Sequence, residues 1–313
     1  MTAKKPNLLR SLISDLELNT APAPMGAYAI SKAFRPFSQS VHGRAARRGS
    51  TTGILLVQNL KCPQLNEQML STLSDVGPEF VTKYLSKEGY EHSLKGSFKF
   101  GTLAEYKKKE GDLSNRGRFG DEKESIQQHI FNSRSGYFER FKYSGLEIKN
   151  SHFLGLDNDV VIEFQANSYC ACCSVGKYDA KSADALRNNG NPDITHFVTY
   201  NLSKLRSALN KIFSAEEKWN NSALIGRTIL YGDKDRRWEI EESFTVDAQR
   251  DALGIFMGLA FVKDKTRFEH EDEYRLMIID LNAMGALSSD APSHAFIHES
   301  ILEAITASGE AGK

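Results

Sequence analysis

The sequence predicts an α+β fold in which a helical N-terminal part packs on a mainly antiparallel, split or mixed sheet. Two observations lead to this class. Apolar residues recur at helical spacing before residue 96, and short runs of alternating or β-branched residues, separated by turn residues, follow it. With 313 residues, of which 40% are apolar, the chain is long enough to form one large core or two small ones.

The first 53 residues are predicted to form a basic arm that precedes the compact domain. Apolar residues at positions 8–16 recur at helical spacing and predict a short amphipathic helix. The arm is either a loosely ordered extension or a surface for a partner or RNA. No acidic residue occurs between Leu18 and Asn66, where the cations are Lys32, Arg35, Arg44, Arg47, Arg48 and Lys61.

A single domain is then expected over residues 54–313. It is predicted to begin with two helices, Gln64–Leu73 and Pro78–Leu94, which Gly96 ends. Two more helices are predicted at Leu202–Phe213 and Ala295–Ile305. The strand candidates are Ser97–Thr102, Tyr137–Tyr143, Leu146–Lys149, Val160–Gln165, Tyr169–Ser174, His196–Tyr200, Leu224–Tyr231, Ile255–Val262 and Tyr274–Ile279.

Composition and motif searches exclude several classes of protein. Forty basic and forty acidic side chains cancel, so no global field attracts nucleic acid or an anionic membrane. The longest apolar run, Ala252–Val262, is too short to span a bilayer, and no secretory signal is evident. We therefore expect a soluble, cytoplasmic protein without a membrane partner. Phosphate-loop, dinucleotide-turn, zinc-protease, serine-hydrolase and protein-kinase motifs do not occur.

Three of the four cysteines cluster in one predicted strand, as Cys170, Cys172 and Cys173, while Cys62 stands alone. A second cysteine pair at finger-like spacing is missing and the eight histidines are scattered, so no metal site is predicted. Reduced thiols on a buried strand are expected instead.

Two acids precede the last predicted strand. Glu271 and Glu273 are spaced as i and i+2, so both carboxylates would project from one side if the strand begins there. Their mutual repulsion would raise the pKa of at least one, which is typical of acids that serve as a base or stabilise positive charge. The alternative is a solvated turn with a run of charges.

Three segments, taken in order, resemble the ADP-ribosyltransferase fold. They are Phe98–Tyr106 followed by Arg116–Glu124, then Cys172–Ser174, and then Glu271–Arg275. The resemblance is to poorly characterised bacterial proteins whose first core strand reads F-[RK]-F-G-T-L-x-x-Y and leads into R-x-D-x-x-E. Those proteins end with a Lys-containing strand followed by E-x-E-Y-R. The likeness covers about residues 80–280 and is one of motifs.

The resemblance implies NAD as a substrate and assigns roles to particular residues. In the family, an Arg or His on the first core strand contacts NAD, a Ser ending a middle strand supports the nicotinamide ribose, and the second Glu of E-x-E is catalytic. By order, Lys99 takes the first role, although it is neither Arg nor His; Ser174 takes the second and Glu273 the third, with Glu271 positioning or deprotonating the nucleophile. The implied NAD-binding residues are Lys99, Thr102, Tyr106, Arg116, Arg118, Ser174 and Tyr274.

The chemistry of these residue types suits NAD cleavage. Arg116, Arg118 and Lys99 supply cations for a diphosphate, and Tyr106, Phe100 or Tyr274 supplies a flat wall for the nicotinamide ring. The competing interpretation makes these ordinary loop charges, strand-end residues and core aromatics.

The expected function is that of an NAD-dependent ADP-ribosyltransferase. The resemblance implies a bacterial toxin or phage-defence effector that modifies a macromolecule, with RNA favoured over DNA or protein as acceptor because the arm is basic. The arm would equally suit an acidic antitoxin or chaperone. One alternative is a catalytically silent module that recruits a partner through the arm. Another is a metal-independent nuclease that uses Lys99, Arg118 and Glu273.

Overall fold

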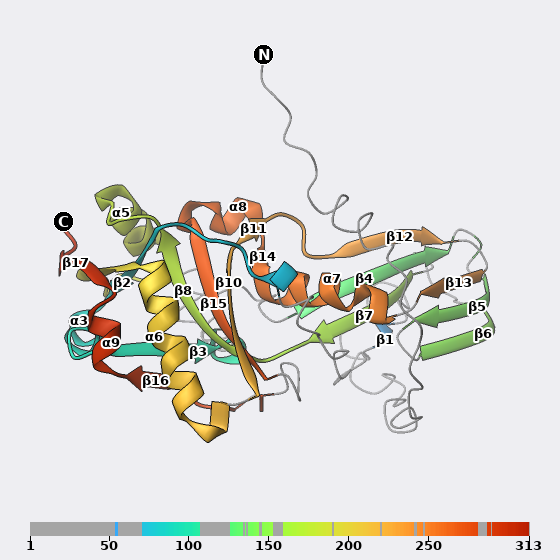
Figure 1. Ribbon diagram of the computed structural model, residues 1–313. Helices are drawn as coiled ribbons and strands as arrows, with labels where there is room; N and C mark the ends of the chain where they lie inside the picture. The colour runs from blue at the N-terminus through green and yellow to red at the C-terminus, as the bar shows by residue number, and fades with distance from the viewer. Residues whose placement is uncertain are drawn as a thin grey trace, which may run out of the picture. The chain divides into compact units, whose positions relative to one another are not determined.

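The computed structural model (Figure 1) shows one compact unit, Pro36–Lys313, that holds all of the residues described. The predicted arm, residues 1–53, lies outside the described residues, as does most of the predicted helix Gln64–Leu73, of which residues 71–73 are helical. The described residues are 54–55, 71–106, 126–133, 135, 137–143, 146–152, 159–189, 191–219, 221–240, 243–246, 248–280, 287–288 and 290–312.

An eight-stranded antiparallel sheet is the largest sheet among the described residues and confirms the predicted α+β class. Its strand order is β10-β15-β8-β2-β9-β17, and β3 pairs with the beginning of β8 and with β16, so the sheet divides at β8. The strands are β10 (Ser222–Thr228), β15 (Glu273–Asp280), β8 (Tyr169–Val175), β2 (Phe80–Leu85), β9 (His196–Asn201), β17 (Ile305–Glu310), β3 (Ser97–Thr102) and β16 (His294–Ile297).

Helices cover both faces of this sheet. Helix α6 (Leu202–Ala215) lies across one face, as Figure 1 shows, and α7 (Ala248–Phe261) packs against the other. Asn201 starts α6, because its side chain accepts a hydrogen bond from the N–H of Lys204 at 3.0 Å. Strand β15 alternates between the two cores: Tyr274, Leu276 and Ile278 face α6, whereas Met277 and Ile279 face α7.

Three smaller sheets contain the remaining described strands. A four-stranded sheet consists of β1 (Ile54–Leu55), β7 (Asp159–Gln165), β4 (Ile126–Ser133) and β12 (Arg236–Ile240). A three-stranded sheet consists of β13 (Ser243–Val246), β5 (Tyr137–Tyr143) and β6 (Leu146–His152), and a two-stranded one of β11 (Leu230–Tyr231) and β14 (Val262–Lys263). Short helices are α3 (Lys87–Ser93), α5 (Ala180–Asn189), η3 (Glu217–Trp219), α8 (Lys265–Phe268), η4 (Glu269–Glu271) and α9 (Glu299–Leu302). No helix among the described residues is long and apolar enough to cross a membrane.

The predicted helix Pro78–Leu94 is wrong over its first half, which forms strand β2. This strand, Phe80–Leu85, pairs with β8 on one side and β9 on the other, and its side chains alternate between the two faces of the sheet. Val81 is fully buried in the core that packs against α6. Only the second half is helical. Helix α3 begins after Ser86, whose side chain caps the helix by accepting a hydrogen bond from the N–H of Gly89.

The predicted strand Ile255–Val262 is wrong as well, because Ala248–Phe261 is helix α7 and only Val262–Lys263 is a strand. This helix packs against the main sheet on one side and an aromatic core on the other, so its sequence is apolar on nearly every side. A continuous apolar run does not by itself separate a buried helix from a buried strand.

The predicted C-terminal helix Ala295–Ile305 is also wrong. Its residues belong to β16, to the short helix α9 and to the start of β17, so its two ends pair with two different strands. The turn between β16 and α9 is fixed by the N–H of His298, which donates to the carbonyl of Gly96 at 3.0 Å. Pairing with the sheet thus overrides the helical spacing of the apolar residues.

Candidate functional site

Strand pairing places Glu273 and Ser174 side by side. They are direct partners in the antiparallel ladder between β15 and β8, so both side chains lie on the same face of the sheet with Cβ atoms about 4.5–5.5 Å apart. Thr82 on β2 and Thr199 on β9 continue this row, and their hydroxyl groups are 2.9 Å apart. The face that packs against α7 therefore carries a row of polar residues at one end of the sheet.

The carboxylate of Glu273 is buried and paired with two cations. Its Oε1 accepts from Nε of Arg275 at 2.8 Å, and its Oε2 lies 2.5 Å from Nζ of Lys263. Only 3% of Glu273 and 1% of Arg275 is exposed. Arg275 also donates from Nη1 to the carbonyl of Ala260 at 2.6 Å, which ties the site to the end of α7. Buried charges of this kind persist only when they are paired.

Glu271 joins the same network from a different element. Its Oε2 accepts from Nζ of Lys263 at 2.7 Å, so this ammonium bridges the two glutamates. The expectation that both acids project from one strand is wrong, because η4 ends at Glu271 and β15 begins at Glu273. Asp272 between them has a left-handed backbone, with φ of 41°, which a regular strand excludes.

The two glutamates differ in their affinity for a proton. Burial acts to raise the pKa of Glu273, but the charges of Arg275 and Lys263 outweigh it and hold that pKa well below its ordinary value. Burial raises the pKa of Glu271, although Lys263 acts in the opposite direction. Glu273 is thus a permanent anion at neutral pH, and Glu271 accepts a proton more readily. Such a separation of two neighbouring acids is common in active sites.

Tyr106 and two thiols lie on the same face of the sheet as Glu273. The ring of Tyr106 lies against Gly101, where a Cβ would come within 3.2 Å of it. Burial raises the pKa of Tyr106 well above its ordinary value, and the charges of Cys172, Cys170 and Glu273 act in the same direction. The Sγ atoms of Cys170 and Cys172 are 3.7 Å apart, and both cysteines are free.

The other predicted site residues lie apart from this cluster. Lys99 is exposed on β3, and Thr102 is buried with its Oγ1 accepting from the N–H of Glu105 at 3.0 Å, which is a capping role. Tyr274 faces α6, on the side of the sheet opposite to Glu273, and Gly226 lies directly against its hydroxyl group. Arg116 and Arg118 lie outside the described residues.

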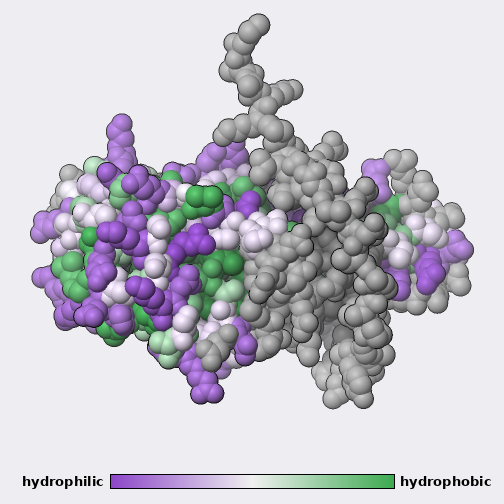
Figure 2. Space-filling model, in the orientation of Figure 1, coloured by the Kyte–Doolittle hydropathy of each residue, from purple (hydrophilic) through white to green (hydrophobic). Residues whose placement is uncertain are grey.

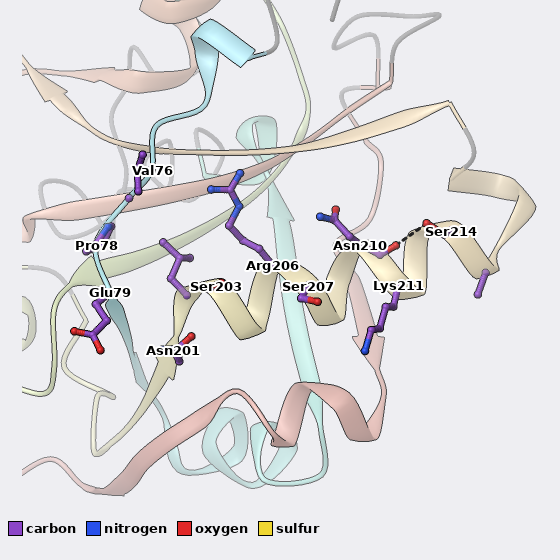
Figure 3. Close-up of a pocket in the computed structure, with 13 residues that line it drawn as sticks. Val76, Pro78, Glu79, Asn201, Ser203, Arg206, Ser207, Asn210, Lys211 and Ser214 are labelled. Atoms are coloured by element: carbon purple, nitrogen blue, oxygen red, sulfur yellow. Dashed lines mark hydrogen bonds between the residues drawn. The ribbon is translucent and has the colours of Figure 1, made fainter.

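A groove of about 1020 Å³ lies on the face of the sheet that carries Tyr274. It runs along α6, whose outer face is mainly hydrophilic in Figure 2, and is closed on one side by the segment Val76–Glu79. Figure 3 shows Arg206 pointing from α6 toward Val76, and its Nη1 donates to the carbonyl of Asp75, the residue before this segment, at 3.3 Å. Because the sheet separates the two, this groove is no part of the Glu273 cluster.

Of the predicted site residues, the structure brings Glu273, Ser174 and Tyr106 to one face of the sheet, whereas Lys263 and Arg275 had no predicted role. Arg275 stood in the motif that carried the resemblance, as the last residue of E-x-E-Y-R, whereas Lys263 directly follows the predicted strand Ile255–Val262. The pairing of Lys263 with both carboxylates depends on packing between β14, η4 and β15, which no spacing in the sequence reveals. Glu273 and Arg275, in contrast, stand at i and i+2 of one strand, a spacing that places both side chains on the same face. No protein-family model, no curated protein and no solved structure matches this chain.

Proposed function

We propose that this chain is an NAD-dependent ADP-ribosyltransferase that acts on a macromolecular acceptor, with RNA favoured. The observation that carries the proposal is the pairing of Glu273 with Ser174 on one face of the sheet. These are the carboxylate and the hydroxyl group that the motif resemblance assigns to the nicotinamide ribose. Tyr106 packs on the same side of the sheet, which adds support, since an aromatic ring there suits a planar ligand.

The charge state of Glu273 suits the reaction. In NAD cleavage the bond between C1′ of the ribose and the ring nitrogen breaks, and its electron pair neutralises the positively charged ring. Positive charge then develops on the ribose, as in glycoside cleavage, and a fixed carboxylate stabilises it. The acceptor attacks C1′ and loses a proton. Glu273 remains ionised because Arg275 and Lys263 hold its pKa low, so it is ready for this role at neutral pH.

The proposal is tested with NAD labelled in the nicotinamide ring. The purified protein is expected to release nicotinamide, faster with RNA, DNA or protein acceptor, and the acceptor should gain the mass of one ADP-ribose. Absence of release with every acceptor would overturn the proposal. RNA that is shortened without NAD would indicate a nuclease instead.

Ser174→Ala is expected to slow nicotinamide release about fivefold to tenfold, because the lost hydroxyl group removes one hydrogen bond worth about 1 kcal/mol. Ser174 is partly exposed, so the variant should fold normally. Ser308→Ala, on the exposed face of edge strand β17, is the matched control and should release nicotinamide at the parental rate. Equal rates for both variants would remove Ser174 from the site.

A further inference from the structure

Lys263 is paired with two carboxylates, although a single carboxylate would neutralise the charge of its ammonium group. Its Nζ is 2.7 Å from Oε2 of Glu271 and 2.5 Å from Oε2 of Glu273, and it also lies 5.0 Å from the centre of the Phe268 ring. Only 6% of Lys263 is exposed, so its charge is taken out of water and needs a counter-charge. Either carboxylate alone supplies one. The ammonium can therefore leave one glutamate and remain paired with the other.

The two oxygen atoms of Glu273 are held by different kinds of cation. Oε1 is held by Arg275, a planar and fully buried group that is also fixed on the carbonyl of Ala260. Oε2 is covered by Lys263, which ends the two-residue strand β14 and precedes the exposed residue Asp264. A lysine ammonium on a flexible stem changes its partner more readily than an arginine fork does. Oε2 is therefore the oxygen atom, itself buried in this structure, whose cation a ligand can displace.

We infer that Lys263 is a resident counter-ion of Glu273, which the positively charged nicotinamide ring displaces while Glu271 retains the displaced ammonium. The inference rests on the proposed function. One cation then replaces another beside Oε2, so the charge next to the carboxylate stays balanced. The reduced dinucleotide has a neutral ring and brings no such replacement. The site therefore selects oxidised over reduced dinucleotide, and Glu271 holds Lys263 in place of positioning the nucleophile.

The first variant that tests the inference is Lys263→Gln, with NAD and NADH binding measured separately by titration calorimetry. Without the competing ammonium, NAD should bind about tenfold more tightly, whereas the affinity for NADH should stay within about twofold of the parental value. Lys265→Gln is the control, because this lysine has an exposed i, i+4 pair with Glu269 at 3.5 Å. It should leave both affinities unchanged.

The second variant, Glu271→Gln, should shift the ratio of the NAD affinity to the NADH affinity in the opposite direction. It removes the alternative partner of Lys263, so the ammonium holds Glu273 more firmly and NAD should bind about tenfold more weakly, again with little change for NADH. Opposite shifts from two changes in one ion bridge are not produced by a loss of folding, which would lower both affinities together. If one variant does not fold, the direction of the shift in the other variant still tests the inference.

The outcomes separate the inference from the proposed function. Opposite shifts in the NAD to NADH ratio support both. If the parent releases nicotinamide but neither variant changes the ratio, the counter-ion role is overturned and the transferase stands. If the parent binds neither dinucleotide, both are overturned.

Discussion

Glu273→Gln is expected to lower the free energy of unfolding by about 3–5 kcal/mol, measured by urea denaturation at pH 7. The substitution leaves the fully buried Arg275 without its anion and removes one of the two carboxylates of Lys263. Breaking a buried ion pair costs this much because the remaining charge stays out of water without its counter-charge. Arg275→Met should cost a similar amount. The double variant should cost less than the sum of the two, because the residues share one interaction.

The control for this prediction is Lys265→Gln, which breaks an exposed pair and should change the stability by about 0–1 kcal/mol. A Glu273→Gln protein within 1 kcal/mol of the parent would show that the network contributes little. The prediction also sets the conditions of an activity assay. Loss of nicotinamide release in Glu273→Gln is evidence of catalysis only at a temperature at which the variant is shown to be folded.

The pH dependence of the network follows from the direction of the pKa shifts. The pKa of Glu273 is lower in the folded protein than in the unfolded chain, so the unfolded chain binds more protons at acid pH. The stabilisation by Glu273 is therefore fully present above the unfolded pKa of about 4.5 and is lost as the pH falls below it. Glu271 has the opposite shift, so its ionisation above pH 4.5 works against folding.

The sequence predicted part of this site because strand alternation is local. Tyr274–Ile279 alternates between two cores, and this predicted most of the strand that begins at Glu273. The order of the motifs then predicted that Ser174 would lie near Glu273, and the ladder between β8 and β15 places them opposite each other. Local spacing did not reveal that Lys263 lies between Glu271 and Glu273. Two acids that would repel each other on a strand are instead joined by one ammonium.

The errors in the fold have a common cause. Helix α7 is buried on two sides, so its apolar residues show no preferred face, and Ile255–Val262 was mistaken for a strand. In Phe80–Leu85 and Ala295–Ile305, apolar residues occur at spacings that suit a helix, but pairing with distant strands decides the structure. Partners more than a hundred residues away, such as β9 for β2, leave no trace in a local window.

His129 is expected to make the protein sensitive to mild acid. Burial, followed by the nearby charge of Arg236, lowers the pKa of His129 from 6.5 to about 3. Its ring is buried among aromatic rings, 4.7 Å from Phe164 and 4.9 Å from Trp238 between ring centres, so the folded protein disfavours a proton on it. Unfolding at a pH between 3 and 6.5 therefore takes up one proton at this residue, and stability falls as the pH is lowered through this range.

The size of this effect is set by the unfolded pKa. At pH 5, protonation of the imidazole stabilises the unfolded chain by about 2 kcal/mol, whereas it stabilises the folded protein by almost nothing. The variant His129→Phe keeps an aromatic ring in the same core but cannot take up a proton. Its loss of stability between pH 7.5 and pH 5 should therefore be smaller than the parental loss by about 2 kcal/mol, measured by urea denaturation at both pH values.

Phe141→Leu is the matched control for His129→Phe, because Phe141 is fully buried in the same aromatic core and has no titratable group. It should be less stable than the parent by the same amount at both pH values, since the effect of lost packing does not depend on protons. Glu273 does not affect the comparison, because its contribution to the stability of the folded protein is lost only below about pH 4.5. If His129→Phe and Phe141→Leu show the same pH dependence, His129 carries a proton in the folded protein, and the ring cluster of His129, Phe164 and Trp238 holds a charge.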